Sequence, residues 1–93
     1  MQAAILPVAD RHNDYARRVE GELAEAGVRC RVDARSESVG KKIRDAELAK
    51  VPYMLVVGDR EEGDGTVSVR AHGDADARTL PIADARNEIS GPD

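Results

Sequence analysis

Two short apolar segments, separated by two segments of helical periodicity, constrain the fold of this 93-residue chain more than any other feature. The first apolar run covers residues 3–8, and the most apolar run in the chain covers residues 53–57. Between the two helical segments, residues 28–32 alternate apolar and basic side chains, which predicts a strand with one covered face. Helical crossovers of this kind connect parallel strands with a right-handed turn. The sequence therefore predicts an α/β fold that begins with a βαβαβ unit.

The first predicted helix follows the polar residues after the first strand. Ala16, Val19 and Leu23 recur at helical spacing and predict its buried face. Asn13 is expected to be the N-cap, and Gly27 is expected to end the helix from the C′ position.

The second predicted helix runs from about Ser38 to Ala49 and ends before Pro52. Its expected apolar stripe consists of Val39, Ile43 and Ala46. Lys42 falls off this stripe and is expected to face solvent. Gly40 is expected to let the helix begin tightly against its neighbours.

The C-terminal third is predicted to extend the sheet. Residues 58–65 are expected to form a polar loop, and the alternating residues 66–70 to form an antiparallel hairpin with residues 53–57. A weak strand is expected at 78–80, and a helix is expected to begin near Pro81. Residues 90–93 are expected to be a frayed tail.

If the most apolar strand is central, the first three strands have the order 2-1-3, and the antiparallel hairpin strand is added beyond the third. The first two helices then lie on opposite faces, which gives a three-layer α/β/α arrangement in a single domain over residues 1–93. The strand order reverses between strands 1 and 3, and open α/β sheets bind ligands outside the carboxyl ends of their strands at such a point. The expected binding surface consists of loops 10–13 and 58–62, with Arg35 and Ser36 close by.

The Gly40-Lys41-Lys42 sequence suggests a phosphate-binding loop, but other parts of that motif are missing. Arg35 stands where the early glycine of the loop is needed, and Lys42 stands where a Ser or Thr would hold magnesium. We therefore exclude a nucleotide-binding P-loop.

Other classes of site are also disfavoured. Cys30 is the single cysteine, so it cannot form an internal disulfide, and we expect it to pack in a strand. His12 and His72 have no Cys or His partners at the spacing of a zinc site. The chain has no apolar run near the length of a membrane span and no secretory leader after Met1, so we expect a cytoplasmic protein without a membrane partner. The formal net charge of −4 argues mildly against a nucleic-acid partner, although cations gather between residues 29 and 50.

Residues 33–70 contain a series of motifs in a fixed order. They are D-x-R-x-E-x-x-G-x-K-I-R-x-A, basic-apolar-Pro-Tyr-Met, V-x-G-D-[KR]-E and V-x-V-R. In order and spacing this series resembles the C-terminal anticodon-binding domain of class II threonyl-tRNA synthetases. The resemblance extends over nearly the whole chain and fades after about residue 80. Related domains occur in prolyl-, glycyl- and histidyl-tRNA synthetases, but the segment VPYMLVVGDRE favours the threonyl branch.

The resemblance implies a three-layer α/β/α domain with a five-stranded mixed sheet of order 2-1-3-4-5, in which strand 4 is antiparallel. It also implies that the domain grips the anticodon loop of tRNA-Thr. It places catalysis, with ATP, magnesium and zinc, in a separate upstream domain whose motifs do not occur here. We therefore expect a domain without a cofactor that is not a catalyst by itself. The rest of the synthetase chain is expected as a partner, in a homodimeric parent enzyme.

The resemblance also implies roles for individual residues. Glu61 matches a glutamate that contacts an anticodon base, and its carboxylate suits the N1–H and N2–H₂ donors of the middle guanine. Arg70 matches an arginine whose planar fork can contact base acceptors. Ser36 stands at a base-contacting position where many relatives have asparagine, and Lys50 stands where others often have arginine. Arg35 is expected to orient this loop or to contact the RNA backbone.

Two other readings remain open at this point. The same fold could serve as a protein-interaction or regulatory module, which would be indifferent to a change in the anticodon. A small enzyme or nucleotide binder is the weaker alternative, because a nucleophile–base pair, a glycine-rich phosphate loop and metal ligands are missing. Without the resemblance, Glu61 would be a solvent-facing loop acid and Arg70 part of a cross-strand ion pair.

Overall fold

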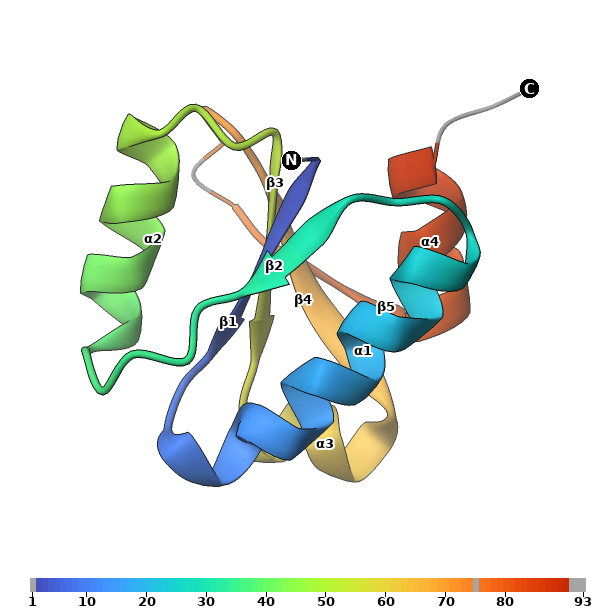
Figure 1. Cartoon of the computed structure of the whole chain (residues 1–93), viewed down its shortest axis with the longest axis horizontal. Helices are drawn as coiled ribbons and strands as arrows, with labels where there is room; N and C mark the ends of the chain where they lie inside the picture. The colour runs from blue at the N-terminus through green and yellow to red at the C-terminus, as the bar shows by residue number, and fades with distance from the viewer. Residues whose placement is uncertain (1, 75, 91–93) are drawn as a thin grey trace.

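The computed structural model describes residues 2–74 and 76–90, and strands and helices alternate along them nearly as the sequence predicts (Figure 1). The elements are β1 (Ala3–Pro7), the 3-10 helix η1 (Asp10–His12), α1 (Asn13–Glu25), β2 (Cys30–Val32), α2 (Val39–Leu48), β3 (Tyr53–Val57), α3 (Asp59–Asp64), β4 (Thr66–Ala71), β5 (Arg78–Pro81) and α4 (Ile82–Ser90). Within the described ranges, no helix is both long and apolar enough to cross a membrane.

The five strands form one mixed sheet in the order β2-β1-β3-β4-β5. β1 pairs in parallel with β2 and with β3, whereas β4 is antiparallel to β3, and β5 is antiparallel to β4. The central position of β3 follows from its composition, since Met54, Leu55 and Val57 are fully buried. The predicted order and the antiparallel fourth strand are confirmed.

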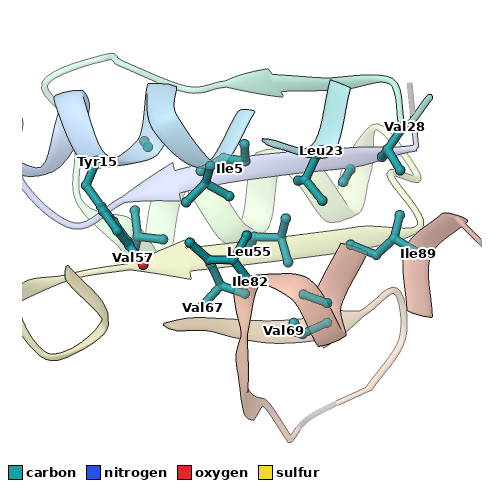
Figure 2. Packing of buried hydrophobic residues seen from close by; sticks show 14 residues of the cluster. Ile5, Tyr15, Leu23, Val28, Leu55, Val57, Val67, Val69, Ile82 and Ile89 are labelled. Atoms are coloured by element: carbon teal, nitrogen blue, oxygen red, sulfur yellow. The ribbon is translucent and has the colours of Figure 1, made fainter. Parts of the chain in front are cut away.

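Helices cover both faces of the sheet, so the three-layer prediction is also confirmed. α1 and α4 lie on one face and α2 lies on the other (Figure 1). Figure 2 shows the larger core, in which Ile5 and Leu55 meet Leu23 of α1 and Ile82 of α4. Cys30 packs against the edge of this core, and burial raises the pKa of its thiol.

A smaller core lies beneath α2. Its buried members are Ala4, Leu6, Ala46, Val51 and Met54. The alternation of strand side chains explains the division, because Ala3 and Ile5 face α1 while Ala4 and Leu6 face α2. The predicted stripe of α1 packs in the larger core, and Ile43 and Ala46 of the predicted α2 stripe pack in the smaller one.

Several predicted boundaries are wrong by a few residues. Asn13 is the first residue of α1, and His12 occupies the N-cap position without a side-chain cap hydrogen bond. β2 starts at Cys30 because the N–H of Val28 still donates to the carbonyl of Leu23, 3.0 Å away, and completes the turn that ends α1. Gly27 has the positive φ, 79°, expected of a residue that ends a helix.

Lys42 does not face solvent, so that prediction is wrong. Its side chain is only 2% exposed, and its Nζ donates a hydrogen bond of 2.9 Å to the carbonyl of Pro7. The aliphatic stem of a lysine can cross apolar surface and bring the ammonium group to a polar acceptor, here at the end of β1. The explanation for Gly40 is also wrong, since a Cβ atom there would have no neighbour within 4 Å.

The predicted loop at 58–65 contains a short helix, α3. Gly58 is its N-cap, and Glu61 Oε1 accepts a hydrogen bond of 2.8 Å from the N–H of Gly58. Gly65 ends the helix with a φ of 71°. The antiparallel pairing of β3 with β4 is confirmed, and so are β5 and α4. Residues 91–93 of the predicted tail lie outside the described residues, and Ser90 is the last residue of α4.

Candidate nucleic-acid interface

The loops that follow β1, β2 and β3 meet at the carboxyl edge of these strands, as the strand order predicts. Ser36, in the loop after β2, donates a hydrogen bond from Oγ to Asp10 Oδ2, 3.2 Å away. Asp59, the first residue of α3, forms hydrogen bonds with Arg11 and His12 in the segment after β1. Three segments far apart in sequence therefore share this edge.

Arg11, His12 and Asp59, here named the Asp59 cluster, connect the loop after β1 to the start of α3. The Arg11 guanidinium donates through Nε to Asp59 Oδ1 at 3.0 Å and through Nη2 to Oδ2 at 2.8 Å. His12 Nε2 lies 2.6 Å from Asp59 Oδ1. These hydrogen bonds, first that of Arg11 and then that of His12, hold the pKa of Asp59 well below its usual range. Sequence reasoning considered His12 only as a metal ligand and missed this cluster.

Arg35 is hydrogen-bonded to two carboxylates of its own chain. Its guanidinium donates to both oxygens of Asp33, at 2.8 and 2.7 Å, and to Asp45 of α2 at 3.0 Å. The hydrogen bond from Arg35 lowers the pKa of Asp33. This geometry fits the first of its two expected roles, because it fixes the loop carrying Ser36 against α2.

Glu61 lies at the same edge with its carboxylate held by the main chain. A Cβ atom at Gly58 would stand 3.3 Å from Glu61 Oε1 and 3.1 Å from Val8 Cγ2, so this corner is closely packed. Each carboxylate oxygen can accept two hydrogen bonds. Glu61 therefore keeps acceptor capacity for two parallel donors of a ligand while Oε1 remains bonded to Gly58.

Lys50 and Arg70 lie at the opposite end of the strands, here called the amino edge, where the parallel strands begin. Arg70 is in register with Met54 near the start of β3, and Lys50 precedes that strand. The steps from residue 53 to 57 span about 13 Å of strand. The five predicted site residues thus form two separate groups, with Arg35, Ser36 and Glu61 at the carboxyl edge and Lys50 and Arg70 at the amino edge.

A groove between α2 and β4 extends along the helix between these groups. Its volume is about 430 Å³, and its lining residues are Gly40, Ile43, Arg44, Glu47, Leu48 and Arg70. Arg70 shares the sheet face of Met54, which α2 only partly covers. Leu48 is 76% exposed there. The groove thus combines two guanidinium groups, of Arg44 and Arg70, with the acid Glu47 and an exposed apolar side chain.

Lys50 has an unusual backbone conformation, with a φ of 58° directly after the C-cap of α2. This left-handed position is usually taken by glycine. Among the described residues, no group of three or more His, Cys, Asp or Glu side chains is placed to hold a metal ion.

The chain is similar to known proteins over nearly its whole length. A family model described as an anticodon binding domain matches residues 2–91. The threonine–tRNA ligase of Symbiobacterium thermophilum is 49% identical over 94 residues, which is 97% of this chain and 14% of that protein. The corresponding ligase of Chloroherpeton thalassium is 47% identical over 91% of this chain and 13% of its own length. The chain thus spans only a small part of these relatives.

Solved structures share the fold. The RNA binding domain of threonyl-tRNA synthetase from Cryptosporidium parvum matches with a TM-score of 0.91 and 30% identity, over 96% of this chain and 22% of that chain. A prolyl-tRNA synthetase from the same organism matches with a TM-score of 0.86 and 25% identity, over 96% of this chain and 20% of that chain. With a family model that matches nearly its whole length, this chain belongs to the anticodon binding domain family.

Proposed function

We propose that this domain binds the anticodon loop of tRNA-Thr and recognises its bases as part of a threonyl-tRNA ligase. The observation that carries the proposal is the similarity of nearly the whole chain to threonine–tRNA ligases, at 47% and 49% identity for the two described above. Proteins recognise RNA sequence mainly in unstacked loops, where base edges are exposed.

At the carboxyl edge, Glu61 is the proposed base-reading residue. Its carboxylate accepts hydrogen bonds from N1–H and N2–H₂ of the middle guanine of the anticodon. Ser36 offers a neighbouring hydroxyl that is oriented by Asp10. Arg35 supports the Ser36 loop through Asp33 and Asp45.

At the amino edge, Lys50 and Arg70 contact the RNA strand after it has passed along the groove between α2 and β4. Arg70 can contact a base or a phosphate with its planar fork, whereas Lys50 neutralises a phosphate as a point charge. The groove supports this path because it extends along α2 and ends beside Arg70.

The remaining activity of the proposed parent enzyme belongs to other domains. ATP, magnesium and zinc are assigned to a separate catalytic domain, and no cofactor is assigned to this one. The parent enzyme is proposed to be a cytoplasmic homodimer that joins threonine to its tRNA.

Fluorescence anisotropy of a labelled tRNA-Thr anticodon stem-loop, titrated with the chain at low salt, tests the proposal. A second stem-loop carries adenine in place of the middle guanine. We expect the natural loop to bind more tightly and Glu61→Ala to abolish the preference, a change of about 1–3 kcal/mol for one bidentate contact. Glu62→Ala, which removes an exposed acid from the same helix, is the matched control and should keep the preference.

Arg70→Ala should weaken binding to both stem-loops. Equal binding of the two loops by the unmodified chain, abolished by modest salt, would contradict base reading and leave only electrostatic attraction. Absence of binding at low salt would favour a protein-interaction module.

A further inference from the structure

We propose that Arg11 and His12 act through Asp59 as positioning residues that fix Glu61 relative to Ser36. The inference rests on the proposed function, since it gives these residues a purpose in base discrimination. The connection from Arg11 and His12 to Glu61 runs through Asp59 and the first turn of α3.

The contacts of His12 define its tautomer. The N–H of Ala9 donates to His12 Nδ1 at 3.1 Å, and a backbone N–H can only donate. Nδ1 therefore carries no proton, and the ring proton is on Nε2, which donates to Asp59 Oδ1 at 2.6 Å. The ring is 2% exposed, whereas the Asp59 side chain is 72% exposed, so the imidazole is fixed within the fold and reaches a carboxylate at the surface. His12 is a rigid donor aimed at a single carboxylate oxygen.

α3 depends on such contacts for its position. It is six residues long and contains no buried residue. A helix of this length is not stable by itself in water, because nucleation costs more than a few hydrogen bonds return. The Asp59 cluster connects the first residue of α3 to the loop after β1, and the Gly58–Glu61 hydrogen bond then sets the carboxylate within the same turn.

The same 3-10 helix also contacts the Ser36 loop. Asp10 accepts from Ser36 Oγ, while its neighbours Arg11 and His12 donate to Asp59. Three consecutive residues of η1 therefore join the two proposed base-contacting residues to one short, rigid segment. The distance between Ser36 and Glu61 is set by η1, and with it the spacing of the RNA groups that the domain can accept.

Amide hydrogen exchange of the Gly58 N–H, measured by NMR, tests the positioning without RNA. Asp59→Asn keeps the size of the side chain but places an amide N–H₂ group against Arg11 or His12. We expect exchange of this N–H to accelerate about tenfold after correction for the intrinsic rate, which corresponds to the loss of one charge-assisted hydrogen bond. Asp64→Asn, with the same change at the other end of α3, should leave it unchanged. Equal exchange in both variants would overturn the proposal.

The two stem-loops described above test the consequence for recognition. Asp59→Asn and His12→Gln should reduce the preference for guanine over adenine at least threefold, a size set by partial loss of one base contact. The affinity of these variants for the adenine loop should change no more than that of Asp64→Asn. The preference of Arg11→Lys for guanine should lie between those of the unmodified chain and Asp59→Asn, because lysine keeps the charge but loses the planar fork. An unchanged preference in Asp59→Asn, with Glu61→Ala abolishing it, would refute the inference alone. An unchanged preference in Glu61→Ala would instead refute base reading by Glu61, and Gly58 exchange would then decide the positioning role.

Discussion

At the scale of single residues, Lys50 combines a strained backbone with a proposed RNA contact. A left-handed conformation costs a residue with a Cβ atom about 1–2 kcal/mol, and Lys50 has a φ of 58°. We expect Lys50→Gly to raise the free energy of unfolding by about 1 kcal/mol in urea titrations, because glycine removes that cost. The same variant should lower the slope of log affinity for RNA against log salt by about one, as for the loss of one phosphate contact.

Lys50→Ala is the matched control for this prediction. It removes the same cation but keeps a Cβ atom, so it should weaken RNA binding without the gain in stability. A gain in both variants would show that the lysine charge, and not the backbone, limits stability at this position.

The lowered pKa values of Asp33 and Asp59 predict a loss of stability in acid. A carboxyl group whose pKa is lower in the folded than in the unfolded chain stabilises the fold above its unfolded pKa of about 3.9, and this contribution is lost as the pH falls through the folded value. Arg35 lowers the pKa of Asp33, and Arg11 with His12 lowers that of Asp59. The melting temperature should therefore decline below about pH 4.

In Asp33→Asn/Asp59→Asn the melting temperature should depend less steeply on pH in this range. The decline should persist in Asp64→Asn, which removes a carboxylate from the other end of α3. Parallel pH profiles for the double variant and the unmodified chain would contradict this assignment.

At the scale of secondary-structure elements, Lys42 fixes α2 to the end of β1. Lys42→Met keeps the length and apolar stem of the side chain but leaves the buried carbonyl of Pro7 without its donor. We expect a loss of about 1–3 kcal/mol in the free energy of unfolding, the cost of an unpaired buried polar group. The neighbouring exposed cation gives the control, since Lys41→Met should change stability by no more than about 0.5 kcal/mol. Equal effects would mean that the Lys42 ammonium is hydrated in solution.

The elements that sequence patterns predict are those with helical periodicity or with a continuous apolar run. α2 has the first of these patterns and β1 and β3 have the second, and their bounds are predicted within a few residues. α3 has none, because its sequence DREEGD contains no apolar residue and two of its stabilising contacts come from Glu61 and from a loop 47 residues away. The buried position of Lys42 was missed for a similar reason, since its acceptor is the carbonyl of Pro7 in β1, 35 residues away.

The candidate site was predictable to the same extent. Strand order alone brought the loops containing Asp10, Ser36 and Glu61 to one edge. The predicted antiparallel pairing of β4 with β3 places Arg70 at the amino edge. The division of the site residues into two groups follows from this pairing, but it was not among the predictions. The role of His12 depends on two specific hydrogen bonds, and no spacing in the sequence indicates them.

At the scale of the whole molecule, the two faces of the sheet are unequally covered. The described part of the chain buries fourteen residues in the core beneath α1 and α4 (Figure 2), but only five beneath α2. A second groove, of about 610 Å³, separates α2 from β2, so α2 has a groove on each side. Because local opening requires less free energy where fewer apolar contacts are broken, α2 should open before α1 does.

Hydrogen exchange followed by mass spectrometry measures this difference directly. Amides of α2 should exchange through openings of lower free energy than those of α1, whose buried face contains Tyr15, Val19 and Leu23. The anticodon stem-loop should slow exchange in α2, since the proposed RNA path follows its groove, and leave α1 on the opposite face unchanged. Equal protection of the two helices without RNA would contradict the unequal layering, and RNA-induced protection of α1 but not α2 would place the RNA on the wrong face for the proposed site.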